Sequence, residues 1–264
     1  MSSESPPSDL STQDRSCSGY ASALRLRVHR PPPRRALPPV VLYLHAGRFI
    51  SPQAEKSDAI AAALATRLDA VVIAPAYSLA SAQPFPAAPE DAYAALRWSH
   101  QHAESGGWNA RRIAVVGEEA GGNLAAVLAM MARDRDGPRL SAQVLMAPML
   151  DSSLSALSRH ASGEFIGQCE AAYQRYLPAN GDRLHPYASP ALCTRLNELA
   201  PALILSAEGE ALRDEAESYG ARLIAAGVKT KIVRLAQPGW SEAAWSEIIG
   251  FLAPLLNRTR NRPT

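Results

Sequence analysis

Short apolar runs alternate along most of the chain with longer segments that place apolar residues at helical spacing. The runs predict strands at residues 23–30 (alternating, as in an edge strand), 40–45, 70–74, 113–117, 142–147, 202–207 and 230–235. The segments between them predict helices at residues 57–67, 90–102, 122–133, 213–226 and 242–256. Strands separated by helices indicate βαβ units, so we expect an α/β fold with a mainly parallel central sheet flanked by helices.

Two segments depart from this alternation. Residues 1–18 are rich in serine, proline and acidic side chains, a composition typical of disorder. Residues 19–264 would then form one folded domain, since no repeat or linker divides them. Residues 150–187 mix polar and aromatic side chains between two predicted strands, and we expect a small cap or lid inserted at that point.

Composition narrows the class of protein. The 264 residues carry a net charge of +2, which is too small to suggest a nucleic-acid partner. The three cysteines are widely spaced and lack the spacing of a zinc site or a disulfide framework. The polar N-terminus is no signal peptide, and no apolar run is long enough to cross a membrane. We therefore expect a cytoplasmic protein that meets a small-molecule ligand or substrate, without a membrane partner; the oligomeric state stays open.

The most informative segment is a strand, a glycine-framed turn and the start of a helix at residues 113–126. Its sequence is Ile-Ala-Val-Val-Gly-Glu-Glu-Ala-Gly-Gly-Asn-Leu-Ala-Ala. This is the layout of a nucleophile elbow, Gly-x-Ser-x-Gly, with Glu119 in the place of the serine. No Gly-x-Ser-x-Gly occurs elsewhere in the chain. The scaffold is typical of a hydrolase, whereas the residue at the tip is not.

Polar residues follow several of the predicted parallel strands. His45, Glu119, Glu210 and Glu242 each come after a different one. In an open parallel sheet the carboxyl ends of the strands lie at the same edge, where ligands bind. We therefore expect these four side chains to meet in one pocket.

Several motifs together resemble the hormone-sensitive-lipase-like esterases, a branch of the α/β-hydrolase fold. They lie, in order, at residues 42–49, 77–80, 84–98, 117–126, 185–190 and 207–214. Leu-Tyr-Leu-His-Ala-Gly-Arg-Phe resembles the His-Gly-Gly-Gly-Phe oxyanion loop, and Gly-Glu-Glu-Ala-Gly-Gly-Asn-Leu-Ala resembles the nucleophile elbow. The resemblance covers roughly residues 23–256 and implies an α/β-hydrolase fold with a cap.

The resemblance also assigns positions to the site. It places Glu119 at the serine position, Glu210 at the aspartate position and Glu242 at the histidine position. His45, Ala46, Gly47, Arg48 and Ala120 fall in the parts that hold the oxyanion and the substrate. The last histidine of the chain is His185, so no histidine follows the acid position to act as the base.

Three glutamates in one pocket predict an unusual chemistry. Mutual repulsion and burial would raise at least one pKa and leave a protonated acid beside an ionised base. Such a pair suits a repurposed, non-hydrolytic enzyme that isomerises, epimerises, dehydrates or cyclises a small molecule. Glu119 and Glu242 would be the acid and base, Glu210 would tune them, and backbone N–H groups near Gly47 and Ala120 would hold an oxygen. No cofactor is expected.

Alternative functions remain open. The chain can be a pseudo-esterase without catalysis that binds a cationic or polyhydroxylated ligand or a partner, or an esterase with residual activity. The three glutamates with His45 can also bind a divalent cation, although metal binding is not our main interpretation. Arg48 can pair with Glu119 and plug the oxyanion hole, or it can hold an anionic substrate.

Overall fold

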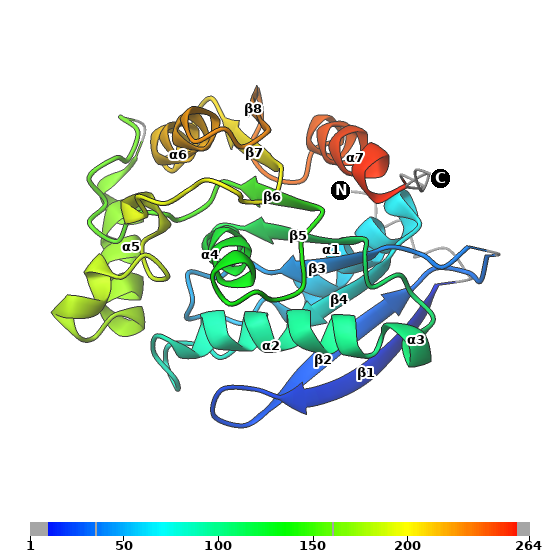
Figure 1. Cartoon of the computed structure of the whole chain (residues 1–264). Helices are drawn as coiled ribbons and strands as arrows, with labels where there is room; N and C mark the ends of the chain where they lie inside the picture. Colours follow the sequence, from blue (N-terminus) through cyan, green and yellow to red (C-terminus); the bar gives the residue numbers. More distant parts are fainter. Residues whose placement is uncertain (1–9, 35, 160, 258–264) are drawn as a thin grey trace.

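A single mixed sheet forms the centre of the computed structural model, which describes residues 10–34, 36–159 and 161–257 (Figure 1). The described strands are β1 (Ser11–Ser18), β2 (Ala23–Arg30), β3 (Val40–Leu44), β4 (Val71–Pro75), β5 (Ile113–Glu118), β6 (Ala142–Met146), β7 (Ala202–Ala207) and β8 (Thr230–Leu235). Their order across the sheet is β1-β2-β4-β3-β5-β6-β7-β8. The β1–β2 and β2–β4 pairs are antiparallel, and every other pair is parallel. The expected α/β fold with a mostly parallel sheet is confirmed.

Helices cover both faces of the sheet (Figure 1). The helices are α1 (Ala54–Leu68), α2 (Ala87–Gln101), α3 (Ala103–Gly106), α4 (Ala120–Asp134), α5 (Gly163–Tyr176), α6 (Arg213–Ala225) and α7 (Glu242–Leu256). Side chains of α2, α4 and α6 pack in the core on one face, and side chains of α1 and α7 pack on the other. Among the described residues, none of the helices has both the length and the apolar character needed to span a bilayer.

The central strands are apolar along their whole length because both of their faces are covered. Every residue of β3 is buried, and so is every residue of β7. A parallel strand between two helical layers has no solvent face, so it reads as a continuous apolar run without alternation. This is why the predicted positions of these strands agree with the structure to within a residue or two.

The first strand corrects the prediction of disorder at the N-terminus. Residues 11–18 form β1, which pairs with β2 along its whole length, and residues 1–9 lie outside the described part of the chain. β2 is therefore not the edge strand; β1 is. Nearly all β1 side chains are exposed, so the strand lacks the apolar alternation by which strands are recognised in a sequence.

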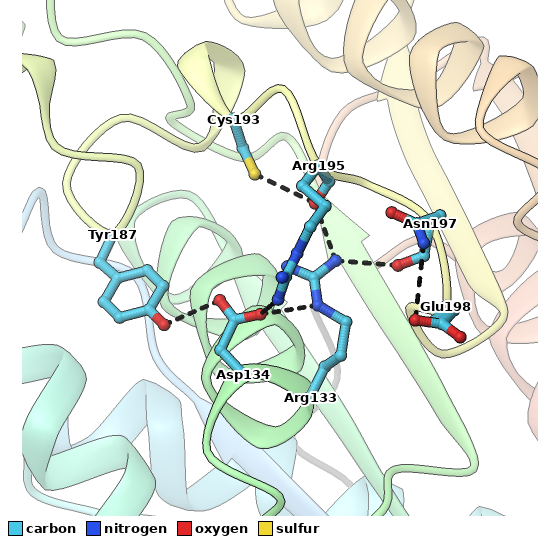
Figure 2. Close-up of polar contacts among 7 residues, drawn as sticks. All are labelled: Arg133, Asp134, Tyr187, Cys193, Arg195, Asn197 and Glu198. Carbon is cyan, nitrogen blue, oxygen red and sulfur yellow. Dashed lines mark hydrogen bonds and ion pairs between the residues drawn. The ribbon is translucent and has the colours of Figure 1, made fainter.

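The connection between β6 and β7 contains α5, within the segment expected to form a cap. After α5, the chain returns along the C-terminal end of α4, where a polar network holds it (Figure 2). The Arg133 guanidinium donates hydrogen bonds to the carbonyl oxygens of Arg195 at 2.7 Å and Asn197 at 2.8 Å. The Asp134 carboxylate accepts one from the Tyr187 hydroxyl at 2.9 Å and pairs with Arg195. This network fixes the returning segment against α4.

Candidate active site

The elbow between β5 and α4 has the backbone that a nucleophile turn requires. Glu119 adopts φ 56° and ψ −112°, a combination that costs a residue with a side chain on the order of 1–3 kcal/mol. The turn is possible because Gly117 and Gly121 lack side chains. A Cβ on Gly117 would lie 1.9 Å from the Gly121 carbonyl oxygen, and one on Gly121 would lie 1.9 Å from the Leu44 carbonyl oxygen. The tip of the elbow is thus held in a strained conformation by close backbone packing.

The Glu119 carboxylate is directed at the loop that follows β3. Its Oε2 atom accepts hydrogen bonds from the backbone N–H groups of Gly47 at 2.9 Å and Arg48 at 3.2 Å. Its Oε1 atom lies 3.3 Å from Nε of Arg48, so the two side chains also form an ion pair. The Glu119 side chain is 17% exposed. Of the two roles considered for Arg48, the structure contains the salt bridge to Glu119.

A cavity of about 440 Å³ opens at this edge of the sheet. Glu119 and Glu210 both line it, together with Ala46, Gly47 and Arg48. Its remaining wall comes from the start of α1, the end of β5, the N-terminus of α5 and the loop after β7. Two of the three predicted glutamates are therefore brought to one cavity by strands that are distant in sequence.

Glu210 lies on the loop after β7, with its side chain folded back on the strand. Its Oε2 atom accepts a hydrogen bond from the Ala207 N–H at 3.1 Å, and its carbonyl oxygen accepts one from the Ser158 hydroxyl at 2.9 Å. Burial raises the pKa of the Glu210 carboxyl to about 7, against the lowering effect of the Ala207 hydrogen bond, and the charges of Glu118 and Glu119 add to the rise. The group therefore changes its charge close to neutral pH.

Glu242 does not belong to the site, and the prediction that it does is wrong. Ser241 caps α7 by accepting a hydrogen bond from the Ala244 N–H at 3.2 Å, so Glu242 is the first residue of that helix. Its side chain is 80% exposed and pairs with the Arg67 guanidinium at 2.8 Å. The acid–base pair of Glu119 and Glu242 is therefore absent.

The metal alternative fails for the same reason, because it required all three glutamates. In the described ranges no group of three or more histidine, cysteine, aspartate or glutamate side chains is arranged to hold a metal ion. His45 is also turned away from the cavity. Its ring stacks on Tyr77 with centroids 4.3 Å apart and bonds to the Ala46 carbonyl oxygen, and burial lowers its pKa. The Tyr77 hydroxyl donates a hydrogen bond to the His45 carbonyl oxygen at 2.8 Å. The contacts between His45 and Tyr77 therefore hold the loop after β3 in place.

Ala120, predicted to help hold an oxygen, is fully buried as the first residue of α4.

The sequence patterns assigned no role to Glu118, which lines the cavity beside the tip of the elbow. Its carboxylate accepts hydrogen bonds from Lys56 Nζ at 3.0 Å and from the Trp240 indole N–H at 2.8 Å. In the sequence, the signal for a role of Glu118 was its position next to Glu119. Its partners Lys56 and Trp240 are distant in sequence and gave no such signal. Within the described cavity wall, Glu118 and Glu119 thus have cationic partners, and Glu210 is held by a backbone hydrogen bond.

The aromatic ring of Phe165 on α5 forms part of the cavity wall. The Arg48 guanidinium lies over this ring, with its carbon atom 5.6 Å from the ring centroid. The segment between β6 and β7 therefore contributes directly to the cavity.

Comparison with known proteins identifies the family of the chain. Residues 41–239 match the family model of the α/β-hydrolase fold. The chain belongs to this family. Esterase LipI of Mycobacterium tuberculosis is 37% identical over 231 residues, which span 85% of this chain and 72% of LipI. The carboxylic ester hydrolase LipN of the same organism is 34% identical over 274 residues, 96% of this chain and 73% of LipN. A hyperthermophilic esterase from the archaeon Pyrobaculum calidifontis superposes with a TM-score of 0.85 at 33% identity, covering 93% of this chain and 85% of that one.

These relatives confirm the resemblance to esterases and overturn the main functional prediction. This α/β-hydrolase is similar over most of its length to proteins named for ester hydrolysis, not for isomerisation, epimerisation, dehydration or cyclisation. The predicted non-hydrolytic chemistry also depended on Glu242, which lies on the surface. The expectation of a repurposed acid–base enzyme is therefore wrong.

Proposed function

We propose that this α/β-hydrolase binds small carboxylic esters in the cavity lined by Gly47, Glu119 and Glu210, and that it does not hydrolyse them through a serine acyl-enzyme. The proposed ligand class is supported by the relatives, which are named as esterases and are similar to this chain over most of its length. The proposal for the chemistry rests on one observation. The Glu119 carboxylate accepts the hydrogen bonds of the Gly47 and Arg48 N–H groups, in the loop that resembles the oxyanion loop of the family.

The position of this carboxylate opposes ester hydrolysis in two ways. Backbone N–H groups of an oxyanion hole accelerate acyl transfer because they bind the negative oxygen that forms in the transition state. Here they already bind a negative oxygen, that of Glu119. A glutamate is also a poor replacement for serine, because acyl transfer to its carboxylate would give an anhydride.

A general base of the usual kind is also missing from the cavity wall. No histidine is among the described residues that line it, and the position that resembles the family's histidine holds Glu242, on the surface. Ser51 and Ser162 line the cavity, but a serine hydroxyl is a weak nucleophile without an adjacent base. The cavity has a volume of about 440 Å³ and a wall of polar side chains with the ring of Phe165, which are features that suit the binding of a small ligand.

The test is to measure binding of ethyl butyrate to the wild-type protein and to a variant with a narrowed cavity. Gly209 lines the cavity, and a Cβ placed there meets no atom within 4 Å, so Gly209→Trp adds a ring without disturbing the core. Gly181 has the same open surroundings outside the cavity, which makes Gly181→Trp the matched control. We expect ligand-detected NMR to show saturable binding to wild type and to Gly181→Trp, and at least about tenfold weaker binding to Gly209→Trp. Equal binding by all three proteins would contradict the proposal.

Slow hydrolysis without a covalent intermediate is the second candidate, and Glu210 is the residue that favours it. A base whose pKa lies near the operating pH is well suited to activate a water molecule, and the Glu210 pKa is raised to about 7. A positioned base contributes roughly 100-fold to 10,000-fold, far less than a complete triad. Any turnover of this kind would depend on Glu210 and not on a serine.

A further inference from the structure

A groove of about 1310 Å³ lies at the amino ends of the parallel strands β5 and β6. The cavity lined by Glu119 and Glu210, called the ester cavity below, lies at the carboxyl ends of the strands. Residues 109–112 and 135–141, which precede β5 and β6, form much of its wall, and the second half of α2 completes it. Glu119, in contrast, follows the carboxyl end of β5. The groove is therefore separate from the ester cavity, and binding in the groove does not depend on the proposed function.

Arginine dominates the wall of this groove. Arg97, Arg111, Arg112, Arg135 and Arg139 line it, and Asp136 is the acidic residue in the described wall. The whole chain has 27 lysines and arginines against 25 acidic residues, so its charges nearly balance. The groove therefore concentrates positive charge that the rest of the protein does not share.

Two of these arginines have internal partners. The Arg112 guanidinium donates to the carbonyl oxygens of Leu37 at 2.6 Å and Leu256 at 3.1 Å. The Arg135 guanidinium donates to the two carboxylate oxygens of Glu90 at 2.8 Å and 2.6 Å. Arg112 and Arg135 are therefore held by contacts within the protein and have a structural role.

The other three arginines have no such partner. Arg97, Arg111 and Arg139 are exposed, and none of them forms an ion pair with a carboxylate of the described ranges. Bringing guanidinium groups together around one concavity costs free energy through mutual repulsion. A bound anion would offset that cost.

We propose that this groove binds a soluble organic phosphate that carries two or more negative charges, of the kind that a nucleoside diphosphate or triphosphate presents. The planar guanidinium matches the oxygens of a phosphoryl group with two parallel hydrogen bonds, which makes arginine the favoured side chain for this task. The groove also has partly buried apolar residues, Ala110, Pro138 and Leu140, against which the organic part of such a ligand can pack.

The distribution of charge favours a small ligand over a nucleic acid. A nucleic acid makes contacts to many phosphates along an extended basic surface. Five arginines line one concavity here, in a chain whose net charge is only +2. A compact polyanion can pair with guanidinium groups that line one groove, whereas a nucleic acid needs a longer basic surface.

Isothermal titration calorimetry of the full chain with ATP, inorganic pyrophosphate and inorganic phosphate tests the proposal. We expect saturable binding at a single site, with ATP and pyrophosphate at least about tenfold tighter than phosphate, and weaker binding as salt is added. The absence of saturable binding of ATP and pyrophosphate at concentrations up to about 5 mM at low salt would overturn it. Tighter binding to duplex DNA, or to phosphatidylglycerol vesicles, than to ATP at equal phosphate concentration would overturn it as well.

The variants assign the binding to the groove. We expect the triple variant Arg97→Gln, Arg111→Gln and Arg139→Gln to weaken ATP binding at least about tenfold. Arg175→Gln, on the exposed face of α5 and outside the groove, is the matched control and should bind ATP as wild type does. Circular dichroism and a cooperative thermal unfolding transition like that of wild type verify that the triple variant is folded. Unchanged ATP affinity in a folded triple variant would overturn the assignment.

Discussion

The carboxylate of Glu119 accepts a hydrogen bond from the backbone N–H of Gly47 at 2.9 Å. The two residues are 72 positions apart in the chain and meet because β3 and β5 are parallel neighbours in the sheet. The turn that presents Glu119 is strained, and the hydrogen bonds of the Gly47 and Arg48 N–H groups with the ion pair to Arg48 help to hold it. The Glu119 carboxylate thus joins the turn after β5 to the loop after β3.

Removing this carboxylate should strengthen the binding of esters. In Glu119→Gly the Gly47 and Arg48 N–H groups become free to donate to the carbonyl oxygen of a ligand, and glycine tolerates the positive φ at this position. We expect the dissociation constant for ethyl butyrate to fall by roughly threefold to tenfold, the range of one or two modest hydrogen bonds. Glu119→Gln is the control, because its amide oxygen can accept the same two hydrogen bonds. Equal affinity in wild type and Glu119→Gly would count against the role of Glu119.

The pH dependence of any slow hydrolysis should follow Glu210. Because burial raises the pKa of this carboxyl to about 7, the basic form becomes more populated as the pH rises through that value. We expect the background-corrected rate with p-nitrophenyl acetate to rise between about pH 6 and pH 8 in wild type and to lose this dependence in Glu210→Gln. A rate that is the same in both proteins at every pH would assign the turnover elsewhere.

Glu242 should be dispensable for the site. Its side chain is exposed and paired with Arg67, and the Arg67 side chain lowers the pKa of Glu242 through a hydrogen bond. We expect Glu242→Gln to bind ethyl butyrate as wild type does and to leave the rate with p-nitrophenyl acetate unchanged. A loss of either property, measured beside Glu210→Gln, would show that Glu242 reaches the ligand after all.

A buried glutamate outside the site should make the stability of the protein depend on pH. Glu215 on α6 is 2% exposed and accepts a hydrogen bond from the Leu150 N–H at 2.9 Å. Burial raises the pKa of Glu215 from 4.5 to about 8, and the nearby Asp151 charge adds to the rise. The native state therefore holds a proton that the unfolded state loses above pH 4.5, and stability falls as the pH rises from there to about 8.

Glu215→Gln removes this titration and keeps an oxygen for the Leu150 hydrogen bond. We expect the free energy of unfolding of wild type, relative to that of the variant, to fall by about 2–3 kcal/mol between about pH 5.5 and pH 8. Urea unfolding at several pH values measures this difference. Parallel pH profiles for the two proteins would contradict the prediction.

The fold could be predicted from sequence where burial leaves a continuous apolar run. β3 and β7 are buried at every position, and both were located closely. β1 could not be found this way, because its residues are almost all exposed and its order comes from backbone pairing with β2. A strand that is held by pairing alone has no hydrophobic pattern to detect.

The site could be predicted only where the backbone itself is specified by the sequence. The spacing of Gly117 and Gly121 marks a turn that no larger residues could form, so the place of Glu119 was foreseeable. Glu242 was misplaced although its helix was predicted to start at this residue, because similarity of the surrounding residues does not fix the direction in which the first side chain of a helix points. Ser241 caps α7, so Glu242 is the first residue of this helix. The Glu242 side chain faces solvent and pairs with Arg67. The partners of Glu118 come from distant segments and leave no local signal.

The most direct measurement of the central claim is intact-protein mass spectrometry after treatment with a fluorophosphonate, together with the rate of p-nitrophenyl acetate hydrolysis. This reagent labels a serine only when a base and an oxyanion hole activate it. With Glu119 in contact with Gly47 and Arg48, we predict no stoichiometric label and no loss of the measured rate after treatment. One label per chain, with loss of ester hydrolysis, would show an activated serine and contradict the account.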